Sequence, residues 1–510
     1  MQTLKPLNRA LLASQPALPQ NLACGTLQRF PEKALQFGEG NFLRAFVDWM
    51  LDETNARGLF HGSAVLVQPI AAGMAAKINE QDGLYTLILR GMEGGKVVES
   101  RRIITSVSRA LNPYEDWAGV AALARSADLR FVFSNTTEAG IAYVEEPYVP
   151  GACPASFPAK VAALLYERFQ AVGGDAARGL IFIPCELIER NGAKLKEYVL
   201  KHAAAWKLGD AFTAWIESAN AFLSTLVDRI VPGYPRAEAE KLTRELGYAD
   251  GLLDTGEIFH LWVIEGSPKF ADELPLHKAG LNVIWTQDMT PYRTRKVRIL
   301  NGAHTACVLA SFLGGLDTVG EMMDDPLFGR FIRKAVFDEI VPALPMEEGE
   351  KKAYANAVLE RFQNPFIRHE LLSISLNSVS KWKVRVLPSL LDTVKNTGRL
   401  PAALAFSLAA LIAFYKGAPA ADGRSLQGER NGAAYPIRDD ADVLAFFAEQ
   451  WKTAKANGDL SALARTVLSQ TAFWGQDLNC LPGMTEAVAA GIRTIETKGA
   501  RAAAESVLAS

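Results

Sequence analysis

The segment that most constrains the fold is ALQFGEGNFLRAFVDWM, which covers residues 34–50. An apolar run typical of a strand ends at Phe37, glycines follow at positions 38 and 40, and apolar residues then recur at helical spacing. A strand, a glycine turn and a helix place backbone N–H groups and a helix N-terminus at one point, which favours a pyrophosphate. The spacing is GxGxxxR rather than GxGxxG, so the motif alone is equally well explained by a turn without a ligand.

The rest of the first half alternates between strand-like and helical segments. Apolar runs typical of strands cover residues 63–70, 101–111, 129–141 and 179–192. Helical segments such as WAGVAALARSA and SFPAKVAALLYERFQAVGG separate several of them. This alternation predicts a parallel sheet with helices on both faces. Ligands of such sheets bind at the carboxyl ends of the strands, so we expect a crevice near residues 38–40, 68, 135–136 and 185–186.

The residue placed to contact an adenosine ribose is Gln68, at the end of the second strand. An acidic residue is usual there, because it binds the ribose hydroxyls and repels a 2′-phosphate. Glutamine lacks that charge, so the pattern does not choose between NAD and NADP. Arg44, in the following helix, could reach a phosphate. The candidate cofactor-binding residues are Phe37, Gly38, Gly40, Asn41, Phe42, Arg44, Gln68, Asn135 and Thr136.

The second half of the chain has helical spacing. From about residue 290 the strand signals fade, and residues 417–435, which are small, polar and glycine-rich, are expected to form a loop. Residues 404–415 predict a buried core helix, shorter than the ~20 residues of a membrane span. We therefore expect an α/β chain: a Rossmann-like dinucleotide-binding domain over residues 1–285, then an all-α domain over residues 286–510 that carries the substrate site.

Charge and cysteine content exclude several classes of protein. The formal net charge is −2, which gives no electrostatic reason to expect nucleic acid or an anionic membrane as partner. The N-terminus has no pattern of a secretory signal. The five cysteines are scattered without a CxxC motif, which indicates reduced thiols and a cytoplasmic protein. The six histidines are equally dispersed, so no metal site is expected.

The segment RKVRILNGAHT, residues 295–305, combines three residue types suited to proton transfer. In a helix Asn301 lies roughly 140° from Lys296 and His304 roughly 60° from Asn301, so some irregularity near Gly302 would bring all three to one face. A buried lysine can donate a proton, an asparagine amide can stabilise an alkoxide, and a histidine can hold the substrate oxygen. The alternatives are a solvated basic face, a turn and a core histidine. A position at the seam of two domains favours the functional interpretation.

Several sequence blocks resemble the mannitol dehydrogenase family of polyol-specific long-chain dehydrogenases. They are QFGEGNFLRAF, FSNTTEAG, CELIERNG, STLVDRIVPGYPR and KVRILNGAHT. The resemblance implies NAD-dependent interconversion of a ketone and an alcohol on a small molecule. It also implies catalytic roles for Lys296, Asn301 and His304, a second oxyanion contact from Asn191, and a place near the substrate for Asp228.

Further blocks, including PCELIERNG, GLDTVGE and AALIAFYKG, resemble family members that act on sugar acids. A substrate carboxylate calls for a cation, ideally an arginine. The candidates are Arg293, Lys381, Lys383 and Arg385, of which Lys381 is preferred for its family block. The competing hypotheses are a related uronate or polyol as substrate, or a dinucleotide-binding regulator without turnover. The presence of all three residues of the Lys–Asn–His set argues against the regulator.

Overall fold

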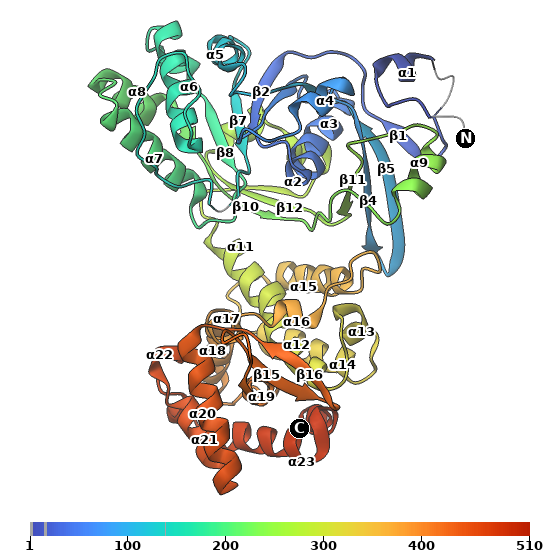
Figure 1. Cartoon of the computed structure of the whole chain (residues 1–510), viewed down its shortest axis with the longest axis vertical. Helices are drawn as coiled ribbons and strands as arrows, with labels where there is room; N and C mark the ends of the chain where they lie inside the picture. Colours follow the sequence, from blue (N-terminus) through green and yellow to red (C-terminus); the bar gives the residue numbers. More distant parts are fainter. Residues whose placement is uncertain (1–3, 15–17, 138, 510) are drawn as a thin grey trace. The chain divides into compact units, whose positions relative to one another are not determined.

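The computed structural model describes residues 4–14, 18–137 and 139–509. The chain divides into two compact units. Unit 1 comprises Met1–Gly91 and Val97–Met289, and unit 2 comprises Thr290–Ser510 together with Met92–Lys96, the tip of a β-hairpin. Figure 1 shows unit 1 in blue to yellow-green and unit 2 mainly in yellow to red.

A six-stranded parallel sheet forms the centre of unit 1. Its strands run in the order β6-β3-β2-β7-β8-β9, and every neighbouring pair is parallel. This is the 3-2-1-4-5-6 order of a Rossmann fold, which confirms the predicted α/β class. The bounds are β2 (Glu32–Phe37), β3 (Ser63–Val67), β6 (Val107–Leu111), β7 (Phe131–Ser134), β8 (Ile181–Pro184) and β9 (Ala221–Phe222).

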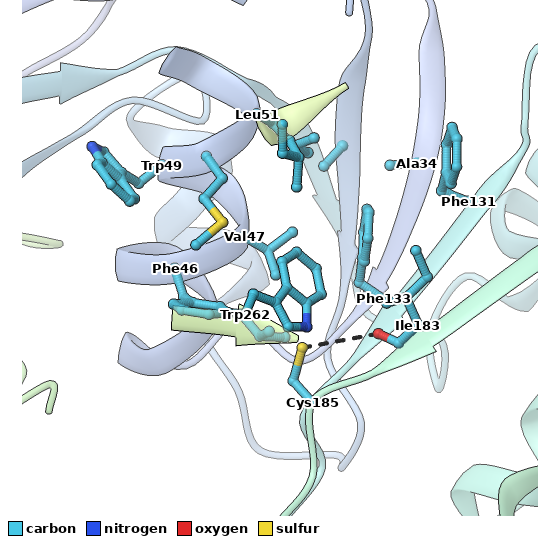
Figure 2. Close-up of a cluster of buried hydrophobic side chains, with 14 of the residues drawn as sticks. Ala34, Phe46, Val47, Trp49, Leu51, Phe131, Phe133, Ile183, Cys185 and Trp262 are labelled. Atoms are coloured by element: carbon cyan, nitrogen blue, oxygen red, sulfur yellow. Dashed lines mark hydrogen bonds between the residues drawn. The ribbon is translucent and has the colours of Figure 1, made fainter. Parts of the chain in front are cut away.

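Alternating side chains of these strands form two separate cores, because successive residues point to opposite faces of a sheet. Leu35, Val132 and Phe182 pack on one face against the helices α5 (Trp117–Arg125), α6 (Phe157–Val172), α7 (Asn191–Ala205) and α8 (Asp210–Ala219). Phe131 and Phe133 pack on the other face with a continuous helix made of α2 (Asn41–Leu43), the π-helical segment η1 (Arg44–Asp48) and α3 (Trp49–Ala56). Figure 2 shows this second core, in which the indole of Trp262 lies between the helix and the strands.

Two further sheets of unit 1 were not expected from the sequence. One has the order β1-β5-β4-β11 and the other β10-β12-β13, and the Trp262 of the second core belongs to β12. Their strands are β1 (Leu22–Cys24), β4 (Tyr85–Glu93), β5 (Lys96–Ile104), β10 (Ser224–Asp228), β11 (Asp254–Glu257), β12 (Leu261–Glu265) and β13 (Val283–Thr286). The remaining helices of unit 1 are α1 (Arg9–Ser14), α4 (Ala75–Glu80), η2 (Ala176–Arg178), α9 (Ala239–Leu246), α10 (Pro268–Glu273) and η3 (Leu276–Ala279).

The prediction of one strand over residues 101–111 was wrong. The segment divides at Thr105, so that its first half completes β5 and its second half is β6 of the Rossmann sheet. The buried carboxylate of Asp52 accepts hydrogen bonds from the backbone N–H and the hydroxyl of Thr105, at 2.8 and 2.7 Å. These bonds fix the chain where it passes from one sheet to the other.

Unit 2 is built around a helix that is apolar on all sides. Every residue of α19 (Ala402–Phe414) from Ala403 onward is buried, which confirms the predicted core helix. Within the described residues, no helix has the length and apolar character needed to cross a membrane. The other helical segments are α11 (Thr290–Arg295), η4 (Lys296–Asn301), α12 (Gly302–Leu313), α13 (Val319–Asp324), α14 (Phe328–Arg333), η5 (Lys334–Ile340), α15 (Glu348–Phe362), α16 (Leu371–Ile374), α17 (Ser378–Arg385), α18 (Leu387–Thr397), α20 (Ala441–Asn457), α21 (Leu460–Leu468), α22 (Thr471–Trp474), η6 (Leu478–Cys480) and α23 (Met484–Ala509).

Unit 2 is helical but not all-α, and the loop predicted over residues 417–435 is a small sheet. Its strands β14 (Gly417–Pro419), β15 (Leu426–Arg430) and β16 (Ala433–Ile437) pair antiparallel in chain order. The turn between β15 and β16 is Asn431–Gly432, and both residues have positive φ, 53° and 80°. Asn-Gly is a strong signal for a hairpin because both positions tolerate that conformation. The flanking residues are small and polar, so the alternation of apolar and polar residues that is typical of strands was not visible in the sequence.

Candidate active site

The glycine turn after β2 exposes backbone to a ligand. Gly38 has φ of 121° and donates its N–H to the carbonyl of Val67 at 3.0 Å. A Cβ added at Gly38 would lie 3.0 Å from the carbonyl oxygen of Asn135, so only glycine fits there. A Cβ at Gly40 would meet no atom within 4 Å, and the helix beginning at Asn41 follows directly. An open backbone turn at a helix N-terminus fits the pyrophosphate of a dinucleotide.

The ends of β2, β7 and β8 are joined by hydrogen bonds at the same edge of the sheet. The buried carboxylate of Glu186 accepts the Thr136 N–H at 2.9 Å and the hydroxyls of Thr136 and Ser134, each at 3.0 Å. Asn135 donates its N–H to the carbonyl of Phe37 at 3.1 Å. Burial raises the pKa of Glu186, against the lowering effect of these bonds. The predicted residues Asn135 and Thr136 are therefore held beside the glycine turn by Glu186, which the sequence placed at the same crevice but without a role.

Other side chains predicted to bind the cofactor are engaged inside unit 1. Gln68 is buried, and its amide donates to the carbonyls of Ile70 and Ala71 at 3.0 and 2.9 Å while its oxygen accepts the N–H of Ala75. The amide thus orders the loop after β3. The ring of Phe37 is fully buried in the core, so only the backbone of this residue reaches the turn. Phe42 is partly buried and stacks on Phe46 at 5.0 Å.

The guanidinium of Arg44 points into unit 1, which corrects the expectation that it reaches a phosphate. Arg44 is 2% exposed, donates to the carbonyl of Leu252 and to the Oδ1 of Asn41, and lies 3.7 Å from the carboxylate of Asp254. The same group lies over the ring of Tyr85. The arginine of the GxGxxxR motif therefore connects the residue after the glycine turn, Asn41, to the interior of unit 1.

Asn191 is a structural residue in this geometry rather than a free oxyanion donor. It is fully buried at the start of α7, and its Nδ2 donates to the carbonyls of Pro184 and Glu186, both at 3.0 Å. Its Oδ1 accepts the N–H groups of Gly192 and Thr225, both at 2.9 Å. The side chain therefore ties the end of β8 to α7 and β10, and its donors are already used. This corrects the prediction that Asn191 contacts the substrate oxygen.

Asp228 is the last residue of β10 and is buried. The guanidinium of the next residue, Arg229, donates to the carbonyls of Ala45, Phe259 and Ile258, and it lies over the ring of Trp49. Burial lowers the pKa of Arg229 to about 9.

Lys296, Asn301 and His304 lie on one helix that contains a π-helical segment. The segment η4 runs from Lys296 to Asn301, and α12 continues from Gly302. A π turn closes over about five residues, so Lys296 and Asn301 come to the same face, and His304 follows one α-helical turn later. The irregularity expected near Gly302 is this π segment. Gly302 itself has a different role, because a Cβ there would lie 3.0 Å from the carbonyl oxygen of Arg385.

His304 is buried between two aromatic rings. Its imidazole stacks on Phe362 with centroids 4.0 Å apart, and His369 meets it edge-on at 5.2 Å. Its Nε2 has no hydrogen-bond partner among the described residues. Burial, and then the charges of His369, Arg361, Arg385 and Lys381, hold the pKa of His304 well below its usual value. The ring is therefore neutral near pH 7 and keeps one nitrogen for a ligand.

Two of these cations, Lys381 and Arg385, lie on the helix α17. Arg385 donates to the hydroxyl of Thr305 at 3.5 Å, and Lys381 donates to the carbonyl of Ile374 at 2.9 Å. In the described part of the chain neither forms an ion pair, and burial lowers the pKa of both. The other two predicted cations, Arg293 in α11 and Lys383 in α17, are half-buried. Arg361 and His369 were not predicted from the sequence. The available signal was the block RFQNPFIRHE, residues 361–370, in which three basic residues flank an Asn-Pro turn signal.

Comparison with known proteins gives two matches to family models. A model described as the mannitol dehydrogenase Rossmann domain matches residues 32–278. A model described as the mannitol dehydrogenase C-terminal domain matches residues 288–496. Together they cover most of the chain.

Curated relatives are similar over nearly the whole length. An altronate oxidoreductase of Pectobacterium carotovorum subsp. carotovorum (strain PC1) is 50% identical over 480 residues, 94% of this chain and 97% of that protein. The altronate oxidoreductase of Yersinia enterocolitica is 48% identical over 476 residues, 93% of this chain and 96% of that protein.

Two solved structures share the fold. Pseudomonas fluorescens mannitol 2-dehydrogenase, in a ternary complex with NAD and D-mannitol, has a TM-score of 0.67 and 23% identity, with 99% of both chains covered. A D-sorbitol dehydrogenase in substrate-free form has a TM-score of 0.77 and 23% identity, with 98% of this chain and 99% of that one covered.

Proposed function

The chain belongs to the mannitol dehydrogenase family, and we propose that it catalyses the reversible, NAD-dependent reduction of the ketone of D-tagaturonate to D-altronate. Family membership makes it an NAD-dependent oxidoreductase that acts on a CH–OH group. The sugar-acid substrate is supported by the relatives named altronate oxidoreductase and by the cations around His304. We place the enzyme in the cytoplasm, because all five cysteines are free thiols.

The glycine turn of unit 1 fits the cofactor. The backbone of Gly38 and Gly40 and the helix that begins at Asn41 would hold the pyrophosphate, with Asn135 and Thr136 beside them. When bound, NAD supplies or takes up the hydride. The chain's own residues have to orient the substrate, stabilise charge on its oxygen and move one proton.

We assign the proton to Lys296. In the reducing direction the ketone carbon gains a hydride, and the Lys296 ammonium gives one proton to the substrate oxygen, which becomes the hydroxyl. The amide of Asn301, on the same face of the helix, donates a hydrogen bond to that oxygen as negative charge develops on it. The free Nε2 of the neutral His304 holds the same oxygen or the neighbouring hydroxyl. Oxidation of the alcohol runs through the same steps in reverse.

The single observation that carries the sugar-acid substrate is the half-buried guanidinium of Arg385, which forms no ion pair with the described residues. A half-buried guanidinium without an acidic partner is costly, and an anionic ligand offsets this cost. The planar guanidinium of Arg385 can donate two parallel hydrogen bonds to a carboxylate, whereas Lys381 already donates to the Ile374 carbonyl. We therefore propose Arg385, with Lys381 beside it, as the cation for the substrate carboxylate. A neutral polyol would leave this charge unmatched.

The experiment that tests the function follows the loss of NADH absorbance after addition of D-tagaturonate, D-fructuronate or D-fructose. We expect rapid loss with tagaturonate. Turnover of fructuronate or fructose alone would refute the proposed substrate while keeping the family chemistry. Lack of turnover with all three substrates, despite bound NADH, would refute the enzymatic role.

The Arg385→Gln variant tests the carboxylate contact. We expect its KM for tagaturonate to rise by about 10- to 100-fold with a smaller change in kcat, because the contact binds ground state and transition state alike. The matched control is Lys383→Gln on the same helix, whose ammonium lies near Gly475. An unchanged KM in Arg385→Gln, or an equal rise in both variants, would contradict the assignment.

A further inference from the structure

The structure places the carboxylate of Glu39 next to Gln68, the uncharged residue that the sequence put at the adenosine ribose. Glu39 stands between the two glycines of the turn, and its Oε1 accepts the N–H of Met74 at 3.2 Å. A Cβ added at Gly73 would lie 2.5 Å from this Oε1 and 2.7 Å from the Oε1 of Gln68. The glutamate from the first turn and the glutamine that ends the second strand therefore pack against the same glycine.

This position has a defined use in Rossmann folds. The end of the second strand contacts the adenosine ribose, and an acidic residue there binds its hydroxyls and excludes a 2′-phosphate. In this chain Gln68 cannot serve, because its amide closes the loop after β3 through Ile70 and Ala71. We propose that Glu39 selects NAD over NADP, its carboxylate accepting the ribose hydroxyls and repelling the 2′-phosphate. The inference rests on the proposed binding of NAD at the glycine turn.

The surroundings of Glu39 favour hydroxyl donors over a second anion. The residue is 7% exposed, and burial raises the pKa of its carboxyl, so the ionised form lacks water and is stabilised by any donor that reaches it. A phosphate brought to the same place adds repulsion that solvent screens weakly. The loop PIAAGMAA, residues 69–76, contains no lysine or arginine to bind a 2′-phosphate. Arg44, the cation that acts on Glu39, is directed into the interior of unit 1.

The Glu39→Gln variant isolates the charge. Glutamine keeps an oxygen that can accept the Met74 N–H, so the turn is preserved while the negative charge is removed. Dissociation constants for NADH and NADPH are measured separately by calorimetry, without substrate. We expect the preference for NADH over NADPH to fall by about tenfold or more, mainly through tighter NADPH binding. The matched control is Glu80→Gln, an exposed glutamate at the end of α4, which should leave the ratio unchanged.

Each outcome of the calorimetry decides the inference. An unchanged NADH-to-NADPH ratio in Glu39→Gln would overturn it, and so would an equal loss of both affinities. If Glu39→Gln does not fold, Glu39→Asp, which retains the charge, takes its place: retained NADH preference supports the inference and lost preference overturns it. Absence of NADH binding by the unmodified protein would instead show that the proposed function itself fails.

Discussion

Replacement of Asn191 by alanine separates a structural role from a catalytic one. The side chain accepts the N–H groups of Gly192 and Thr225 at 2.9 Å, and it donates to the carbonyls of Pro184 and Glu186. An alanine leaves the two N–H donors buried without this acceptor. The carbonyls are less affected, because Pro184 and Glu186 also accept from Thr225 and Ile188. The main cost is therefore that of two unsatisfied donors.

The expected magnitude follows from that count. A buried donor that loses its partner costs about 1–3 kcal/mol, so the loss for two donors in Asn191→Ala should lower the free energy of unfolding by about 2–6 kcal/mol. For a folding unit of this size about 1 kcal/mol corresponds to roughly 2–4 °C, which predicts a drop in Tm of about 4–24 °C. Thermal unfolding followed by circular dichroism measures this, and turnover is then compared below the transition at equal folded protein.

The matched control is Asn301→Ala. Asn301 is half-buried on the proposed catalytic helix, so its removal should cut kcat by about 10²–10³-fold with little change in Tm. Asn191→Ala should instead lower Tm with little change in the kcat of the folded protein. An Asn191→Ala protein with unchanged Tm and a hundredfold lower kcat would refute the structural assignment and restore the oxyanion role.

Lys296→Ala should leave NADH affinity nearly intact while turnover falls by several orders of magnitude, and unchanged turnover would remove Lys296 from the mechanism. Gly38→Ala should weaken NADH binding at least about tenfold, measured by calorimetry, because its φ of 121° and the Asn135 carbonyl leave no room for a Cβ. Burial raises the pKa of Asp48 to about 7, so the stability of the fold decreases as the pH rises from about 4 toward 7. Asp48→Asn should therefore stabilise the fold by about 1–3 kcal/mol more at pH 8 than at pH 4. Equal effects of the substitution at both pH values, measured by urea unfolding, would contradict this. Gly491→Ala should lower Tm despite better helix propensity, because its Cβ would lie 2.6 Å from that of Ala409.

The local pattern of the sequence was sufficient for much of the fold. The alternation of apolar strand-like runs with helical segments predicted the parallel sheet, because this pattern depends on neighbours in the chain. The spacing of Lys296, Asn301 and His304 likewise predicted one helix. The Asn431–Gly432 pair was also a local signal, in this case for a hairpin. The hairpin was not predicted because the residues around the pair are small and polar.

Tertiary structure alone decided which polar side chains remain available. Arg44, Gln68 and Asn191 all stand where a ligand was expected, and the folded chain uses each of them internally. The acceptor of Arg44 lies 208 residues away along the chain and a partner of Asn191 lies 34 away, so no local pattern reveals them. Glu39 became a candidate for cofactor selection only when folding placed it against Gly73. The physical reason is that a buried polar group must find a partner, and that partner is chosen by the packing of distant segments.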